Sequence, residues 1–435
     1  MKIRTLGCKV NVYESEQILQ SLEKTEQWRA ASVAEVADLC IINSCTVTAE
    51  ADRQTRQEIR RTIRDNPNAK VIVTGCYAQM DPDTVVSIPG VDLVLGNSRK
   101  LSLVEYVPDL MRRDDAAVAE VKVEKPDAMT GLPDKILTGF SGRSRAFLQI
   151  QQGCDQGCTF CIIHVARGAS QSIPFTQLVQ QMQKLVTAGF REIVICGVDL
   201  GSYGVDIDAG YDLTDLLSAM LKIPGDFRIR LGSLDPVHIT DRLIGLLRDS
   251  SRICPHIHIS MQSGSTMILK RMKRRYQREM LFERAQKLRL LIPDVVFSAD
   301  IMAGFPTEND EHFADSLSAV EDLEICFPHV FPYSQRKGTP AARIPKQVPK
   351  STRLQRAAAL RELGESVTNR VLNRWIGRHQ RVLLESVKPD GKSGKGRTDH
   401  YLPVEIHGEN LTVGDFYTTS LNLVENGRLI GTANS

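Results

Sequence analysis

The chain has 435 residues, of which 42% are hydrophobic and 25% are charged, as is usual for a globular protein of two or three domains with a sizeable core. No apolar run approaches the roughly 20 residues of a membrane span, which excludes a transmembrane protein, and a formal net charge of +3 is too small to indicate a nucleic-acid partner by itself. Ten cysteines, with no signal-peptide pattern in the opening MKIRTLGCKV, indicate a reducing compartment, so we expect a cytoplasmic protein whose thiols bind metals or act in catalysis.

Strand and helix signals alternate over the first part of the chain. Strand-like runs occur at KIRTLG, at 39–44, at 71–75 and at 91–96, and the Arg-rich segment 48–66 between two of them has a helical pattern. Such alternation predicts a parallel, doubly wound sheet with helices on both faces. We therefore predict an N-terminal α/β domain over residues 1–110.

Three cysteines follow the first three of these strands. They are Cys8 in TLGC, Cys45 in INSC and Cys76 in TGC. Taken singly, each is more simply interpreted as a small buried apolar residue. Because the carboxyl ends of parallel strands share one edge of a sheet, the three together favour a site with three thiolate ligands.

Residues 111–143 are polar, contain Pro126 and Pro133, and show no core periodicity, so we predict a linker there. From Ala146 the alternation of strands and helices resumes. Six repeats are fewer than a closed barrel of eight needs, so 144–372 is predicted to form an open partial (β/α)6 barrel with its site at the strand carboxyl ends. The six strand-like runs are FLQIQQ, 193–197, 228–233, 257–262, 295–304 and 329–333.

A loop with three closely spaced cysteines follows the first of these six strands. Cys154, Cys158 and Cys161 have CxxxCxxC spacing, which can hold three corners of a four-iron cluster and leave the fourth iron free. A zinc site usually needs four ligands, and His164 is the one nearby candidate for the fourth. A disulfide framework is typical of short secreted chains instead. We favour the iron–sulfur interpretation.

The last part of the chain has a different pattern. The runs RVLLESV, HYLPVEI, FYTTSLNLV and RLIGT are short strands separated by Gly, Asp and Asn turns. We predict a small all-β barrel over 373–435, of the kind that can bind oligonucleotides.

Basic residues gather in three places. A basic run is often only a solvated surface, but three clusters in a chain of nearly balanced charge favour contact with phosphates. One cluster lies on the helix after Cys45 and includes Arg53, Arg56, Arg60, Arg61 and Arg64. The other two, which we predict to bind RNA, are Lys270, Arg271, Lys273, Arg274 and Arg275, and Arg370, Arg374, Arg378, Arg381, Lys392, Lys395 and Arg397.

Motifs spread along nearly the whole chain match one known family. They are TLGCKVNVYESE, INSCTVT, TGCYAQ, the cysteine loop, GVDLGSYG, SLDP, LKRMKRRY, DIMAGFPTE and FPYSQRKGTPAAR. The sequence thereby resembles the radical S-adenosylmethionine (SAM) methylthiotransferases, and its C-terminal module looks like the TRAM domain of that family. TLGCKVN and GVDL-SYG look most like the branch that acts on N6-threonylcarbamoyladenosine at position 37 of tRNA.

The resemblance implies two [4Fe–4S] clusters and SAM as cofactors. One cluster would lie on Cys154, Cys158 and Cys161 and bind SAM. The other would lie on the three N-terminal cysteines and carry or activate the sulfur. The implied reaction replaces the hydrogen at carbon 2 of the adenine with a methylthio group. A radical cofactor suits this reaction, because acid–base groups do not readily activate that C–H bond. The implied partners are the tRNA anticodon stem-loop and an electron donor such as flavodoxin or ferredoxin.

Three further residues are candidates for SAM contacts. By resemblance Phe160 packs on the SAM adenine, and Gly197 and Gln262 stand at strand ends where the cofactor would approach. The simpler interpretations are a hydrophobic side chain that shields the cluster, a turn glycine and a structural hydrogen bond. One departure concerns His164 and Val165, which replace the family's usual proline and aromatic residue and put the shape of this loop in question.

Some residues are not expected to act at a site. His256 and His258 point to the same face of a predicted strand, but with no third ligand in view we do not predict a metal pair there. The remaining cysteines lie among apolar residues and are expected in the core; they are Cys40, Cys196, Cys254 and Cys326.

Two classes of function remain open from the sequence. We favour an enzyme, because both cysteine triplets leave an iron open, whereas a structural cluster would have four protein ligands. The alternative is an RNA-binding redox sensor with iron–sulfur clusters and no turnover. Among enzymes, the alternative substrates are N6-isopentenyladenosine in tRNA or a ribosomal protein.

Overall fold

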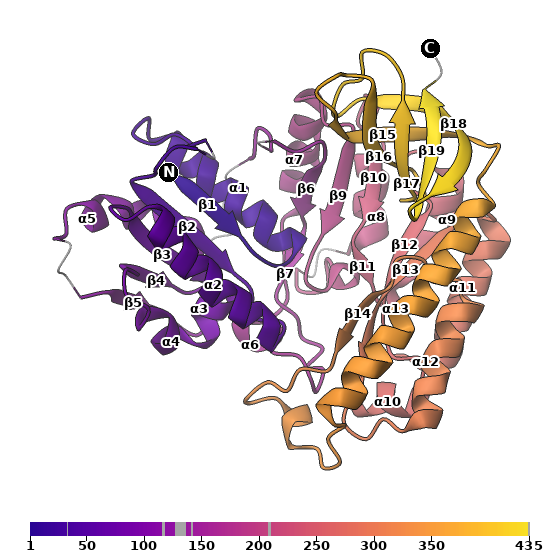
Figure 1. Cartoon of the computed structure of the whole chain (residues 1–435), viewed down its shortest axis with the longest axis horizontal. Coiled ribbons are helices and arrows are strands. Elements are labelled where there is room, and N and C mark those ends of the chain that lie inside the picture. Colours follow the sequence, from indigo (N-terminus) through magenta and orange to yellow (C-terminus); the bar gives the residue numbers. More distant parts are fainter. Residues whose placement is uncertain (33, 115–117, 127–135, 141, 208–209, 434–435) are drawn as a thin grey trace. The chain divides into compact units, whose positions relative to one another are not determined.

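The computed structural model describes residues 1–32, 34–114, 118–126, 136–140, 142–207 and 210–433. Pro133 of the predicted linker lies outside these residues. The chain forms two compact units, each described by itself below (Figure 1). The first unit consists of 1–137, 151–173 and 334–342, and the second of 138–150, 174–333 and 343–435. Among the described residues, no helix is both long enough and apolar enough to cross a membrane.

The first unit contains a five-stranded parallel sheet in the order β1-β2-β3-β4-β5. Helix α1 packs Ile18 and Leu22 on one face, and α2 packs Ile59 on the other, so the sheet is covered on both sides. The prediction of a doubly wound sheet is therefore confirmed. The elements are β1 (Lys2–Thr5), α1 (Lys9–Glu23), β2 (Leu39–Ser44), α2 (Ala49–Asp65), β3 (Lys70–Gly75), α3 (Cys76–Met80), α4 (Pro82–Val86), β4 (Leu93–Leu95), α5 (Val107–Met111) and β5 (Glu120–Lys122).

The fifth strand lies within the stretch predicted as a linker. β5 has three residues, pairs with β4, and has one apolar side chain, Val121, which is 42% exposed. A strand this short and polar has no periodicity that the sequence could show. Backbone pairing with β4 forms it instead.

The cysteine loop belongs to the first unit although the chain reaches it after entering the second. Its ends pair as β7 (Gln151–Gln152) and β8 (Gln171–Ser172), and its helix α6 (Ile163–Arg167) contacts α3. The predicted domain bounds follow the chain order, whereas the observed units are discontinuous.

In the second unit, two adjoining parallel sheets form the open partial barrel. One has the order β10-β9-β6 and the other β11-β12-β13-β14, and a bridge between Ile229 and Ile253 links the end of the first to the approach of the second. The strands are β6 (Ala146–Gln149), β9 (Glu192–Cys196), β10 (Arg228–Leu231), β11 (Ser233–Leu234), β12 (His256–Gln262), β13 (Val296–Ala303) and β14 (His329–Pro332). The helices are α7 (Phe175–Thr187), α8 (Leu213–Met220), α9 (Asp241–Asp249), α10 (Thr266–Arg271), α11 (Arg278–Leu291), α12 (Asp310–Asp322) and α13 (Lys350–Asn373).

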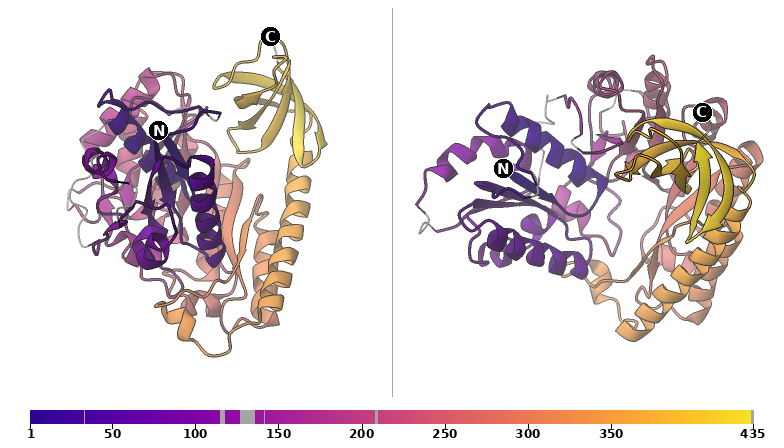
Figure 2. Two further views of the ribbon diagram at one scale, coloured as in Figure 1. Left: turned by 60° about the vertical axis from the view of Figure 1, so that its left-hand side comes forward. Right: turned by 45° about the horizontal axis from the view of Figure 1, so that its top comes forward.

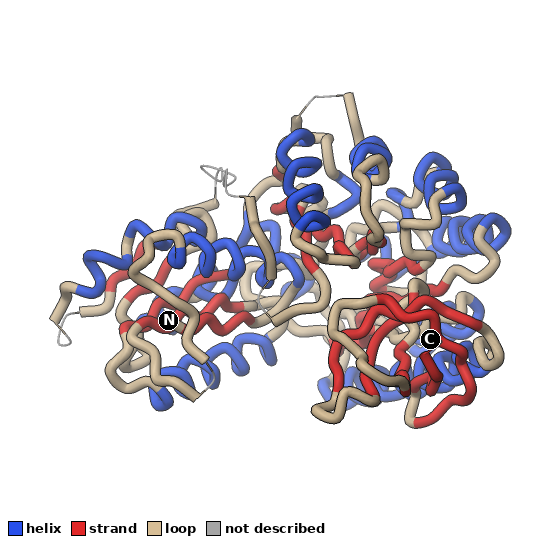
Figure 3. Tube along the Cα trace, turned by 90° about the horizontal axis from the view of Figure 1, so that it is seen from above, coloured by secondary structure: helices blue, strands red, loops and turns tan. Residues whose placement is uncertain are grey.

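Helix α13 leads into a closed five-stranded barrel (Figures 2 and 3). The predicted all-β module is confirmed, but one of its strands, β16, was not predicted. A side chain at Gly394 or Gly396 would come within 2.9 Å of neighbouring atoms, so these glycines allow the strands to approach in so small a barrel. The strands are β15 (His379–Val387), β16 (Ser393–Thr398), β17 (Pro403–His407), β18 (Phe416–Glu425) and β19 (Arg428–Ala433), in the order β15-β16-β17-β19-β18.

A buried ion network joins this barrel to the amino ends of β9 and β10. Arg228 and Arg230 both bond Glu192, at 2.6 and 2.8 Å, and donate to the carbonyls of Arg397 and Thr398 in the barrel. Burial alone would raise the pKa of Glu192, but the two guanidinium groups outweigh it and hold that pKa well below its usual range. The charges are thus paired at the junction, which fixes the barrel on the core.

His400 gives this junction a pH dependence. Burial lowers the pKa of His400 to about 4 from the ordinary 6.5, and its ring lies 4.3 Å from that of Trp375. Because the unfolded chain takes up a proton below pH 6.5 and the folded one does not, stability should fall by up to about 3 kcal/mol between pH 6.5 and 4. In thermal denaturation between pH 6.5 and 4, the variant His400→Phe should lack this pH-dependent loss of stability. An unchanged pH profile would show that His400 is not buried in its neutral form.

Candidate functional site

The carboxyl edge of the first-unit sheet gathers three cysteines. Cys8 precedes α1, Cys45 follows β2, and Cys76 begins α3 directly after β3. Cys45 and Cys76 are buried, while Cys8 is exposed. Since β1, β2 and β3 are neighbours in register, the thiols come from adjacent strand ends, as the sequence predicted.

Burial, with a smaller contribution from the charges of Cys76 and Cys8, raises the pKa of the Cys45 thiol to about 11. A metal that binds thiolates would offset this cost, since ligation deprotonates the sulfur. The side-chain amide of Asn97 donates to the Cys76 Sγ at 3.8 Å.

Two glycines shape this edge. Gly7 and Gly75 directly precede Cys8 and Cys76, and their φ angles are +93° and +95°. A Cβ at Gly7 would lie 2.8 Å from the Cys45 Sγ, and one at Gly75 would lie 2.5 Å from the backbone of Ser44. Only glycine fits such a conformation and such close contact.

In the cysteine loop, backbone amides point at the sulfur atoms. The N–H of Gln156 donates to the Cys154 Sγ at 3.4 Å, and the N–H of Ile163 donates to the Cys161 Sγ at 3.3 Å. Cys158 is buried between them. Hydrogen bonds to cysteine sulfurs stabilise their thiolate form and tune the potential of iron–sulfur clusters.

Neither cysteine triplet has the close spacing of a site for a single ion. Four ligands at the usual Zn–S distance of 2.3 Å lie about 3.8 Å apart. Within the described ranges, neither triplet brings three ligand atoms within 4.8 Å of one another, nor does His164 complete such a group.

A buried ion network connects the two triplets within the first unit. Arg167, at the end of α6, bonds Glu14 at 2.7 Å and the side chain of Asn11 at 2.6 Å, and Lys100 bonds the same Glu14 at 2.7 Å. Burial would raise the pKa of Glu14, but Arg167 and Lys100 lower it to about 2. Glu14 and Asn11 lie on the helix that begins after Cys8. Arg167 was not among the predicted site residues, although it directly precedes Gly168 of the loop.

Removing this arginine should destabilise α1. Arg167→Met leaves part of the Glu14 charge buried without its partner, so we expect the helix to lose about 3 kcal/mol of stability. Hydrogen exchange of α1 amides measures this loss. Arg53→Met on α2, whose ion pair with Glu50 is about half exposed, should cost less than about 1 kcal/mol. Equal effects from both variants would contradict a structural role of the buried network.

The three SAM candidates are distributed over both units. Phe160 lies in the cysteine loop of the first unit, and Gly197 and Gln262 stand at the ends of β9 and β12 in the second. Gln262 has a φ of +58°, and its buried Oε1 accepts no hydrogen bond among the described residues. Gln262 thus combines an uncommon backbone conformation with an unused buried acceptor.

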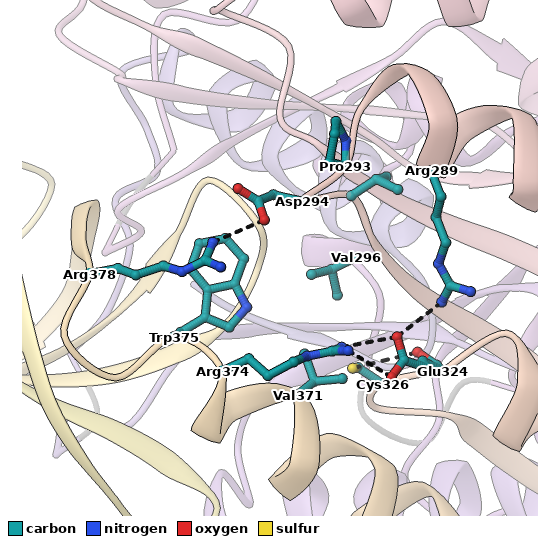
Figure 4. Close-up of a pocket in the computed structure, with 11 residues that line it drawn as sticks. Arg289, Pro293, Asp294, Val296, Glu324, Cys326, Val371, Arg374, Trp375 and Arg378 are labelled. Atoms are coloured by element: carbon teal, nitrogen blue, oxygen red, sulfur yellow. Dashed lines mark hydrogen bonds and ion pairs between the residues drawn. The ribbon is translucent and has the colours of Figure 1, made fainter.

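The basic residues around the β-barrel are mostly in ion pairs. Arg374 and Arg378 line a cavity of about 380 Å³, where they pair with Glu324 and Asp294 (Figure 4). Further pairs join Arg370 to Glu321, Arg381 to Asp226, Lys392 to Glu409 and Arg397 to Glu385. Lys395 is exposed and has no ion-pair partner in the described part of the chain.

The basic cluster at 270–275, in the last turn of α10 and just after it, differs. Arg274 is 6% exposed and paired with Asp235, and Arg271 donates to Thr307. Lys270, Lys273 and Arg275 are exposed, and no carboxylate of a described residue lies within ion-pair distance of them. Among the predicted RNA-binding residues, these three form the group of neighbouring cations whose charges no carboxylate of a described residue neutralises.

Comparison with known proteins gives consistent matches. Residues 1–96 match Uncharacterized protein family UPF0004, and 148–320 match the Radical SAM superfamily. The chain is similar to threonylcarbamoyladenosine tRNA methylthiotransferases MtaB of Rickettsia prowazekii (40% identity over 98% of this chain and 96% of that one) and Thermotoga maritima (37%, 98% and 95%). Its fold resembles the radical S-adenosylmethionine methyltransferase TsrM of Kitasatospora setae, with a TM-score of 0.58 and 14% identity over 78% of this chain and 76% of that one.

Proposed function

Because this chain belongs to the family of radical SAM tRNA methylthiotransferases, we propose that it converts N6-threonylcarbamoyladenosine at position 37 of tRNA to its 2-methylthio derivative. The observation that carries this proposal is the near full-length similarity to relatives named for that nucleoside. Three relatives named as tRNA-2-methylthio-N(6)-dimethylallyladenosine synthases share 32%, 34% and 30% identity, below the 40% and 37% of these two relatives and in the range of two further relatives named for threonylcarbamoyladenosine, at 34% and 33%. The enzyme uses SAM and two [4Fe–4S] clusters, as the family does.

We assign the clusters to the two cysteine triplets, one on Cys154, Cys158 and Cys161 and the other on Cys8, Cys45 and Cys76. When bound, the loop cluster would supply the electron for reductive cleavage of SAM, and the other would carry or activate the sulfur that reaches carbon 2 of the adenine. The sulfur chemistry needs reduced thiols, so we place the reaction in the cytoplasm, with an electron donor such as flavodoxin or ferredoxin.

The protein's own residues position these groups. The N–H groups of Gln156 and Ile163 orient the sulfurs of Cys154 and Cys161. Asn97 donates to Cys76 and to the carbonyl of Ala166 at 2.7 Å, so one side chain contacts both cysteine segments. We assign Phe160, Gly197 and Gln262 to SAM contacts. We assign the two basic clusters predicted to bind RNA, at 270–275 and 370–397, to contacts with the anticodon stem-loop.

The exposed side chains of Lys270, Lys273 and Arg275 should bind tRNA phosphates. In a variant with Lys270, Lys273 and Arg275 changed to Gln, the slope of log binding constant against log salt concentration should be smaller in magnitude by about 2 to 3. The variant should also bind tRNAs of different sequence more weakly to a similar extent. The measurement is fluorescence anisotropy with a labelled tRNA over a salt series. The matched control replaces Arg242, Arg248 and Arg284, which are all in surface ion pairs, and should keep the slope. A slope lowered equally by both variants would mean that only net charge matters.

Mass spectrometry of nucleosides from bulk tRNA tests the function directly. In a strain that lacks the gene, the 2-methylthio form of threonylcarbamoyladenosine should disappear and its unthiolated precursor accumulate, and the gene in trans should restore it. Loss of the methylthio isopentenyl nucleoside instead would contradict the proposed substrate. An unchanged profile in a strain without a second family member would contradict a tRNA substrate altogether.

A further inference from the structure

Two histidines and an aspartate meet on three neighbouring strands of the second unit. The ligand atoms of His258 on β12, Asp300 on β13 and His329 on β14 all lie within 4.8 Å of one another. The His258 Nε2 and the His329 Nδ1 are each 3.3 Å from the Asp300 Oδ1. In the part of the chain that the structure describes, this is the one group of three such side chains with metal-binding spacing.

Strand register brings the three together. His258 pairs with Ser298 across β12 and β13, and Asp300 pairs with His329 across β13 and β14. Because side chains alternate along a strand, Ser298 and Asp300 share a face with His258. Phe297, on the opposite face of β13, lies under the Arg289 guanidinium of α11. The cluster therefore lies on the face turned away from α11.

A serine fixes the orientation of the most buried ligand. The Ser298 Oγ lies 2.7 Å from the His258 Nδ1, which leaves the Nε2 directed to Asp300. The second ring nitrogen of a metal-binding histidine is usually held in this way. The same Oγ is 2.9 Å from the Nε2 of His256, whose ring stacks on Tyr401 at 4.7 Å. His256 is thus structural, and the two ligands that the sequence did not bring together with His258 are Asp300 and His329.

The distances between the groups also match those between ligands of a single ion. Charge-assisted N–H···O bonds are about 2.7–2.9 Å long. Both contacts here are 3.3 Å. Two ligands with 2.0–2.1 Å bonds to a tetrahedral ion are about 3.3–3.4 Å apart. The pairs are therefore spaced as ligands, and exposure increases from His258 at 9% through Asp300 at 26% to His329 at 66%, which gives an entry path.

We propose that His258, Asp300 and His329 bind one divalent transition-metal ion of the zinc type, with its fourth position open to an oxygen ligand. Imidazole nitrogens and a carboxylate oxygen suit zinc and its neighbours, and three protein ligands with one open position are typical of reactive rather than structural sites. The site uses none of the six cysteines of the two triplets and does not depend on the proposed function.

Zinc binding to the holoenzyme tests this proposal. The protein with assembled clusters is first stripped of loosely bound metal. It is then titrated with Zn²⁺ under anaerobic conditions, in competition with a chromophoric chelator. We expect one zinc per chain beyond the iron, with an unchanged cluster spectrum. His258→Gln and Asp300→Asn should each weaken binding by more than about 100-fold, and Ser298→Ala by about 10- to 100-fold, because serine only orients a ligand.

Two further variants make the result decisive. His329→Gln alters a mostly exposed side chain, so it should fold normally and still lose zinc affinity. His407→Gln, at the exposed end of β17, should bind zinc as the unaltered protein does. Unaltered zinc affinity in the His258, Asp300 and His329 variants would overturn the proposal, as would loss of affinity in the His407 variant or no zinc binding by the unaltered protein.

Discussion

Cys161→Ala is expected to abolish cleavage of SAM to 5′-deoxyadenosine. With Cys154 and Cys158 alone, the loop would offer two thiolates, too few for a four-iron cluster that keeps a free iron for SAM. The Ile163 N–H that now donates to the Cys161 Sγ would also lose its acceptor. The rate is measured by chromatography of the dithionite-reduced, reconstituted enzyme, and iron should fall from about eight to about four per chain.

Cys40→Ala is the matched control. Cys40 is fully buried in β2, five residues before Cys45, and belongs to the apolar core. Its replacement should leave iron content and SAM cleavage close to those of the unaltered enzyme. Normal cleavage by Cys161→Ala, or about eight irons bound to it, would contradict the assignment of the loop.

Cys45→Ala should separate the two halves of the reaction. Its thiol lies at the sheet edge with Cys8 and Cys76, so its loss should remove the second cluster and leave the loop cluster intact. We expect SAM cleavage to continue while the methylthio nucleoside falls below detection. Iron should again drop to about four per chain, and electron paramagnetic resonance should retain one cluster signal.

Cys76→Ala should give the same result, because the site needs all three thiolates. Loss of SAM cleavage in either variant, with the loop cluster still present by its spectrum, would show that the triplets do not divide the chemistry as proposed. Methylthio product from Cys45→Ala would show that the second cluster lies elsewhere.

Much of the fold could be predicted because many of its strands are apolar and buried. LCIINS and KVIVTG are wholly buried, so periodicity and length revealed them. β5 and β16 were missed for opposite reasons. The first is short and half-exposed, and the second contains glycines that have low strand propensity but fit close neighbours in the barrel.

The candidate site could be predicted only where a sequence motif carried it. Glycine–cysteine pairs after strands indicated the sheet edge at Cys8 and Cys76, and the CxxxCxxC spacing indicated the loop. Arg167 and its partner Glu14 are 153 residues apart in the chain. His258 and Asp300 meet only through the register of two strands. Contacts of this kind depend on tertiary structure, and no local pattern encodes them.

Both cysteine triplets belong to one compact unit, although the chain enters the other unit between them. Asn97 bonds groups of both cysteine segments, and Arg167 of the loop segment bonds Glu14 and Asn11 on the helix that begins after Cys8. That unit by itself therefore sets the interval between the triplets. On the cluster assignment proposed above, the path that sulfur or an electron takes between the clusters is a property of one compact unit.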